Sequence, residues 1–132
     1  MLIDAADVAD SSTKTHILGY YTLSICMIEL EIIPVQFVRG LPRHPIPAVH
    51  LARLAVAREA QGRGLGSVLL ADAIQRAVAT SDNVGLNLID VFAKDERVRQ
   101  WYATRGFASI SKEPNHLVMP MKAARYSVAA GE

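Results

Sequence analysis

Three glycines at alternate positions, Gly62, Gly64 and Gly66, separate an apolar segment from a segment with helical spacing. A glycine-rich turn between a strand and a helix brings backbone N–H groups close to a phosphate, because no Cβ stands in the way. Ser67 follows directly and adds a hydroxyl group near the start of the expected helix. The stretch therefore predicts a phosphate-binding turn, and its spacing decides which phosphate it suits.

Two common phosphate-binding motifs do not match this spacing. A Walker A loop has a lysine between its last glycine and the Ser or Thr, whereas Ser67 follows Gly66 directly. A dinucleotide-binding turn needs a third glycine that is missing here, and its best ribose ligand would be Asp90, inside the next strand. The remaining pattern, Gln-x-x-Gly-x-Gly from Gln61 to Gly66, fits a helix N-terminus facing a pyrophosphate, or an ordinary glycine-rich loop.

Segments typical of strands and helices alternate around these glycines. The composition of residues 16–34 favours one long or bent strand, in which the side chains of Glu29 and Glu31 would point to the same face. A loop interrupted by prolines follows, and the next strand is expected at 48–56. This order predicts a single mixed α/β domain over residues 1–132, with no clear pattern after Lys122. The other expected elements are a short strand at 1–5, a loop at 7–15, helices at 67–80 and 94–106, and strands at 86–93, 107–110 and 116–121.

The composition indicates one packed domain and excludes several other classes. Of the 132 residues, 51% are hydrophobic and 20% are charged, and the net charge is +1, so nucleic-acid binding would need a local basic surface. Cys26 is the single cysteine and the four histidines are scattered, so neither an intrachain disulfide nor a metal site is expected. The N-terminus lacks the pattern of a secretory signal, and the most apolar run is interrupted by charges. A cytoplasmic protein without a membrane segment is expected.

Two segments, taken together, resemble the GNAT acetyltransferase superfamily. The first, "LARLAVAREAQGRGLGSVLLADAI", is similar to the strand, pyrophosphate loop and helix that bind acetyl-CoA in that family. The second, "LIDVFAKDERVRQWYATRGF", carries Trp101-Tyr102 and Gly106-Phe107 and is similar to the family's closing "FYxxxGF" signature, with Trp in place of the first Phe. The matches lie within residues 48–107, in the family's order and spacing.

The resemblance implies a GNAT-like acyl-CoA N-acyltransferase fold and an acetyl-CoA-dependent N-acetyltransferase. Tyr102 would be the general acid that protonates the CoA sulfur, although a tyrosine here could also simply pack its helix onto the sheet. A backbone N–H near Leu54 to Val56 would stabilise the oxyanion. The same resemblance implies that Leu54, Ala55 and Val56 pair with the pantetheine amides, and that Gln61, Gly62, Arg63, Gly64, Leu65, Gly66 and Ser67 hold the pyrophosphate.

A narrower resemblance links "LGYYTLS" and "RHPIPAVHLARLAV" to the GNAT branch of bacterial toxin–antitoxin systems. It implies acetylation of the amino group of aminoacyl-tRNA, and a ribbon–helix–helix antitoxin as partner. No general base is evident: Glu29 and Glu31 could act through water but more often form a solvated face, and His50 is more often structural. Trp101 could stack on a base of the tRNA but is more often a core residue. Two sets of basic residues could contact tRNA phosphates or be solvated, namely Arg39, Arg43 and Arg53, and Lys94, Arg97, Arg99 and Arg105.

One departure from the family limits these expectations. GNAT proteins usually begin with a strand and two helices that wall the acceptor site, and this chain is expected to lack most of them. A misassigned start, a natural short form or a second chain that completes the wall would each explain this, and the exposed sheet edge favours a homodimer. The alternatives to a tRNA-directed toxin are a GNAT enzyme acting on a small or protein amine, and an inactive module that binds CoA or an antitoxin.

Overall fold

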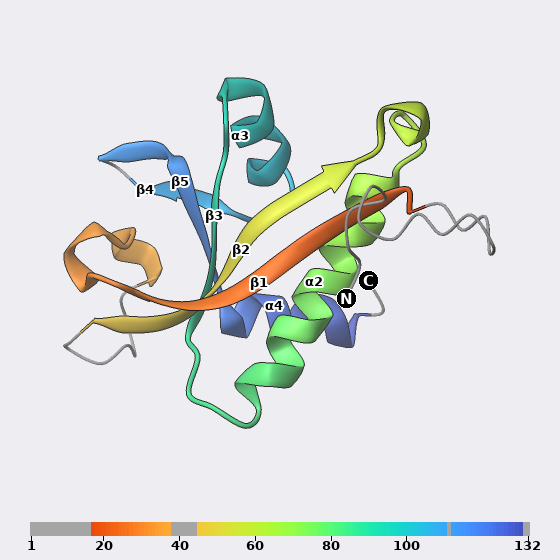
Figure 1. Cartoon of the computed structure of the whole chain (residues 1–132). Helices are drawn as coiled ribbons and strands as arrows, with labels where there is room; N and C mark the ends of the chain where they lie inside the picture. The colour runs from red at the N-terminus through yellow and green to blue at the C-terminus, as the bar shows by residue number, and fades with distance from the viewer. Residues whose placement is uncertain (1–16, 38–44, 111, 131–132) are drawn as a thin grey trace.

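The computed structural model describes residues 17–37, 45–110 and 112–130. Its strands form one sheet in the order β1-β2-β3-β5-β4 (Figure 1). The strands are β1 (Gly19–Ile28), β2 (Ile46–Val56), β3 (Leu88–Phe92), β4 (Ala108–Ile110) and β5 (Glu113–Pro120). The α-helices are α2 (Leu65–Ser81), α3 (Glu96–Ala103) and α4 (Met121–Ala129).

The sheet is mixed, as the sequence predicted. β2 and β3 are parallel and are joined by α2, whereas the β1–β2, β3–β5 and β4–β5 pairs are antiparallel. A parallel pair needs a crossover connection, and α2 supplies it. The predicted strand at 1–5, the loop at 7–15 and the basic residues Arg39 and Arg43 lie outside the described residues.

Two apolar clusters lie on opposite faces of the sheet. The larger one packs α2 and α4 against residues such as Val49 and Leu51 of β2, and it includes Tyr102 of α3. The smaller one contains Ile46 and Ala48, which alternate with Val49 and Leu51 along β2 and therefore point to the other face. Within the described ranges, every helix falls short of the length and apolar character that a membrane-spanning segment needs.

One prediction about an individual segment is wrong. Glu29 and Glu31 do not share a strand face, because β1 ends at Ile28 and a 3-10 helix at Leu30–Ile32 follows. Both glutamates are exposed. They follow the end of β1, which pairs with the start of β2, whereas the glycine loop follows the end of β2. The chain after Lys122, where the sequence showed no clear pattern, continues the last helix, α4.

The feature that positions a site is the divergence of β2 from β3. Their pairing begins at Ala48↔Leu88 and ends at Leu51↔Val91, whereas β2 stays paired with β1 as far as Val56. Figure 1 shows β2 turning toward α2 while β3 continues toward α3. The last five residues of β2 therefore have a strand on one side only, and α3 lies across the resulting gap.

Candidate functional site

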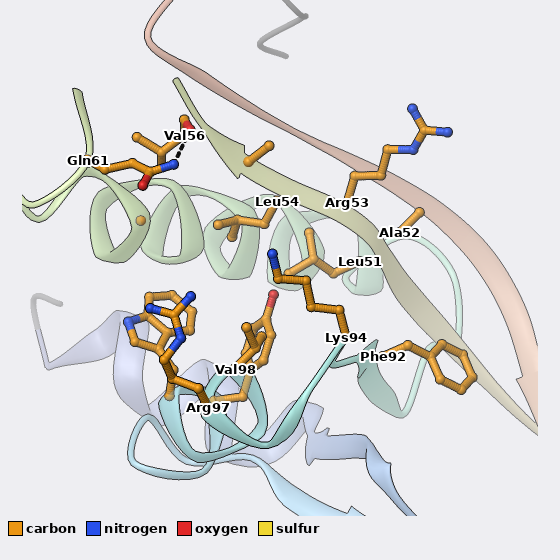
Figure 2. A pocket seen from close by; sticks show the side chains of 14 residues that line it. Leu51, Ala52, Arg53, Leu54, Val56, Gln61, Phe92, Lys94, Arg97 and Val98 are labelled. Atoms are coloured by element: carbon orange, nitrogen blue, oxygen red, sulfur yellow. Dashed lines mark hydrogen bonds between the residues drawn. The ribbon is translucent and has the colours of Figure 1, made fainter. Parts of the chain in front are cut away.

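A cleft of about 510 Å³ occupies the space between β2, the end of β3 and α3 (Figure 2). Backbone N–H and C=O groups on a strand need partners, and on this side β2 has none from β3 beyond Leu51. An extended ligand with amide groups can pair with such an edge as an added strand would. The lining residues are Leu51, Ala52, Arg53, Leu54, Ala55, Val56, Gln61, Gly66, Phe92, Lys94, Arg97, Val98, Trp101 and Tyr102.

The glycine loop closes one end of the cleft and requires its glycines for conformation. Gly62 and Gly64 have φ values of 84° and 76°, in the left-handed region that L side chains rarely adopt. Gln61 holds the loop to the strand, because its Nε2 donates a hydrogen bond to the Val56 carbonyl at 3.1 Å. The two glycines and the Gln61 hydrogen bond thus fix the conformation of the loop. The loop ends directly at the start of α2.

The first turn of α2 presents backbone N–H groups that no side chain caps. Gly64 is the N-cap residue and offers no side-chain oxygen, so the N–H groups that follow it lack the usual acceptor. A Cβ on Gly66 would lie 3.3 Å from the Trp101 ring, so glycine lets α3 approach the start of α2 closely. The free N–H groups give this end of the cleft a partial positive charge, which favours the binding of an anion.

Tyr102 is positioned by α3 and by aromatic contacts. Asp95 caps the helix by accepting a hydrogen bond from the Val98 N–H at 2.9 Å. The Tyr102 ring meets Trp101 and Phe107 edge-on, with centroids 5.1 and 5.4 Å away. Only 6% of Tyr102 is exposed, yet it lines the cleft, and burial raises its pKa to about 12. The phenol therefore keeps its proton at neutral pH and is available as a proton donor.

Two basic side chains add positive charge to the cleft. Figure 2 shows Lys94 extending from the α3 side toward β2, with Arg97 below it, whereas Arg53 points away from this space. Within the described residues, neither Lys94 nor Arg97 forms an ion pair. The basic set predicted around α3 is thus divided, because Arg99 pairs with Glu96.

Arg105 bridges α3 and the helix start behind the cleft. Its guanidinium lies 4.0 Å from the centroid of the Trp101 ring, and its Nη2 donates to Ser67 Oγ at 3.0 Å. Trp101 is half-buried and lines the cleft, so it does more than fill the core. Sequence reasoning singled out Arg105 and Ser67 but gave no sign that they contact each other.

The structure separates the predicted cofactor residues into two groups. Leu54, Ala55, Val56, Gln61 and Gly66 line the cleft together with Tyr102. Gly62, Arg63, Gly64, Leu65 and Ser67 form the loop and the helix start beside it. Four further residues line the cleft and were not predicted as site residues, although they lie inside the two segments that resemble the family: Leu51, Ala52, Phe92 and Val98.

The alternative dinucleotide reading fails at Asp90. This residue is only 1% exposed and its carboxylate is bound by His50 and His116, so it offers no oxygen to a ribose. The four residues Cys26, His50, Asp90 and His116 instead form a polar cluster on the sheet, apart from the residues that line the cleft.

The family profile described as "Acetyltransferase (GNAT) domain" matches residues 20–109, which run from the second residue of β1 into β4 and include every residue that lines the cleft. The chain belongs to the GNAT acetyltransferase family. The GNAT fold predicted from the sequence is thereby confirmed, and the cleft described above is lined by residues from both resembling segments.

Relatives of this GNAT domain include toxins. A tRNA-acetylating toxin of Mycobacterium tuberculosis is 40% identical over 110 residues, which are 83% of this chain and 66% of the toxin. The solved structure of AtaT complexed with acetyl-methionyl-tRNAfMet has a TM-score of 0.80 and 30% identity, and the match covers 89% of this chain and 71% of AtaT.

A second solved structure shows a similar chain with other partners. A tyrosine-to-phenylalanine mutant of the AtaT toxin, bound to the C-terminus of the antitoxin AtaR and to acetyl-CoA, has a TM-score of 0.70 and 31% identity. The match covers 85% of this chain and 64% of that one. This chain thus spans about two thirds of the length of the toxins it matches.

Proposed function

We propose that this GNAT domain transfers an acetyl group from acetyl-CoA to the amino group of aminoacyl-tRNA, as a toxin. The observation that carries the proposal is the cleft itself, in which an unpaired strand edge, an uncapped helix start and a protonated tyrosine lie around one space. The 40% identical relative that acetylates tRNA, and the toxin structure that contains acetyl-CoA, support the same reaction.

The residues of the cleft fit acetyl-CoA, which supplies an activated acetyl thioester. The free edge of Leu54 to Val56 would pair with the pantetheine amides, and one N–H there would stabilise the oxyanion as the amine attacks. The start of α2 would hold the pyrophosphate. Tyr102 would donate its phenolic proton to the departing sulfur, which forms the free thiol. The amine nitrogen would lose one proton to solvent as the N-acetyl product forms, and Tyr102 would regain a proton from solvent.

The acceptor is proposed from charge as well as from the relatives. Lys94 and Arg97 are exposed, form no ion pair in the described part of the chain and line the same cleft as Tyr102. Such side chains bind phosphates by displacing counterions, which is how a chain with a net charge of only +1 would still bind tRNA. The proposed setting is the bacterial cytoplasm, where charged tRNA and acetyl-CoA are both present.

Two further partners belong to this proposal. In the described residues β1 is an edge strand, with Ile25 and Met27 more than half exposed, so it is available to pair with a second copy of the chain. The antitoxin-bound relative supports an antitoxin partner, which we propose to be of the ribbon–helix–helix type. Molar mass by light scattering tests the dimer: a monomer at micromolar concentration would contradict it.

Acetyl transfer is tested by incubating the protein with labelled acetyl-CoA and a panel of acceptors. The panel contains aminoacyl-tRNA, the same tRNA deacylated, the free amino acid, and a small and a protein amine. We expect label in aminoacyl-tRNA alone, and the label should be released with the amino acid when the ester bond is hydrolysed. Label in another amine would refute the tRNA acceptor, and acetyl-CoA binding with no transfer to any acceptor would refute the enzyme.

A further inference from the structure

The polar cluster on the sheet joins three neighbouring strands. Asp90 of β3 is fully buried, and its Oδ1 accepts from the Cys26 thiol of β1 at 3.3 Å and lies 3.0 Å from His50 Nδ1 of β2. His50 and Asp90 are direct partners in the parallel register of β2 and β3. A thiol, an imidazole and a carboxylate thus meet on rigid backbone, outside the residues that line the acetyl-CoA cleft.

We propose that Cys26, His50 and Asp90 form a binding site for Zn²⁺. The Cys26 Sγ, one ring nitrogen of His50 and one Asp90 oxygen all lie within 4.8 Å of one another, so small side-chain shifts would bring them around one ion. Zinc accepts sulfur, nitrogen and oxygen ligands in a tetrahedral arrangement, whereas magnesium and calcium prefer oxygen alone. Three protein ligands leave the fourth position for a water molecule.

The surroundings of the three ligands resemble those of a built metal site. His116 Nε2 lies 2.7 Å from the second Asp90 oxygen, Oδ2, and so fixes the carboxylate while Oδ1 points to Cys26 and His50. Phe92 stacks on His116 at 4.1 Å and meets the His50 ring edge-on at 5.5 Å. Partners that orient ligands in this way are what metal sites require.

Access and proton balance are compatible with binding. Cys26 and His50 are only partly buried, so an ion can reach them, whereas Asp90 is shielded. Coordination replaces the S–H bond of Cys26 by a Zn–S bond and releases one proton to solvent. The ion would link β1, β2 and β3 at the His50↔Asp90 pair. This pair is one residue before Leu51↔Val91, the last pair of β2 and β3. The site is independent of the acetyltransferase proposal.

The test uses the whole purified chain after removal of metal. Zn²⁺ binding is measured by competition with a chromogenic chelator, and Co²⁺ is used as a spectroscopic probe because a Co–thiolate bond gives a charge-transfer band. We expect one Zn²⁺ per chain and a thiolate band with Co²⁺ in the unmodified protein. His116→Gln should weaken Zn²⁺ binding by about 10- to 100-fold, as loss of an orienting partner does.

The ligand substitutions and a matched control complete the experiment. Cys26→Ser and His50→Gln should each weaken Zn²⁺ binding more than His116→Gln does, and Cys26→Ser should also remove the Co²⁺ thiolate band. Asp82→Asn changes an exposed aspartate that pairs with Arg125, so it should leave binding unchanged. No binding at micromolar zinc, or a Co²⁺ complex of the unmodified protein without a thiolate band, would overturn the proposal. The second readout needs no variant to fold.

Discussion

At the scale of single residues, Tyr102 has the burial and the position that both roles proposed from the sequence, packing and proton donation, would require. It packs α3 onto the sheet through its contact with Phe107, and it also lines the cleft. Its burial decides its chemistry, because an apolar surrounding disfavours the phenolate and keeps the proton on the oxygen. A structural tyrosine and a proton donor are therefore compatible readings of the same residue.

The raised pKa of Tyr102 predicts a loss of stability at alkaline pH. In the unfolded chain a tyrosine ionises near its ordinary value of 10.0, whereas folded Tyr102 keeps its proton up to about pH 12. Unfolding therefore releases protons above pH 10, and the free energy of unfolding should fall as the pH rises from about 10 to 12. Urea denaturation across this range should show a smaller fall in Tyr102→Phe. Tyr126→Phe, at an exposed position of α4, should match the unmodified protein, and equal falls in all three would contradict the assignment.

At the scale of elements, α3 determines where Tyr102 and Arg97 lie, and the sequence predicted that helix well. Asp95 was expected near its start and is its N-cap, and Gly106 was expected as its stop and has a φ of 99°. These signals are local, since a cap and a left-handed glycine act on their own neighbours. Local signals also predicted β3 and α2 to within one or two residues at each end.

The elements that the sequence missed depend on contacts over long distances. Helix α4 buries Met121 and Ala124 against α2, and this apolar spacing was present in the chain but too short to stand out. The hydrogen bond between His50 and Asp90 joins residues 40 positions apart, and only the strand order brings them together. The divergence of β2 and β3 was not predicted, since the family resemblance implied only that Leu54 to Val56 pair with the pantetheine amides.

The cap of α3 can be tested by paired substitutions of Asp95. Asp95→Ala removes the acceptor for the Val98 N–H and should lower the free energy of unfolding by about 1 kcal/mol. Asp95→Asn keeps an acceptor and should retain most of the stability. Urea denaturation provides the measurement for both variants. Equal losses in the two variants would mean that the charge of Asp95, rather than its hydrogen bond, stabilises the helix.

At the scale of the whole molecule, apolar packing and polar function lie on different parts of the sheet. Helices α2 and α4 cover one face, where the larger core cluster lies, and the cleft opens where β3 leaves β2. The net charge of +1 does not describe the cleft, whose lining includes Lys94 and Arg97 and no acidic residue. The proposed binding of tRNA should therefore depend on the basic residues of the cleft rather than on the net charge.

Lys94 and Lys122 form a matched pair for testing tRNA binding. Lys94→Ala should weaken tRNA binding and reduce the slope of log affinity against log salt by about 1, because one phosphate contact is lost. Lys122 is exposed on α4 and does not line the cleft, so Lys122→Ala should leave affinity and slope unchanged. Filter binding at several salt concentrations measures both. Equal effects of the two substitutions would indicate non-specific attraction instead of a tRNA surface at the cleft.

The measurement that tests the central claim most directly compares Tyr102→Phe with the unmodified protein in acetyl transfer from acetyl-CoA. The variant removes only the hydroxyl group, so the affinity for acetyl-CoA, measured by calorimetry, should stay unchanged. The rate of thiol release at saturating acceptor should fall by about 10²- to 10⁴-fold, the usual contribution of a general acid. Equal rates in the two proteins would contradict the role of Tyr102, and an unmodified protein with no affinity for acetyl-CoA would contradict the assignment of the cleft.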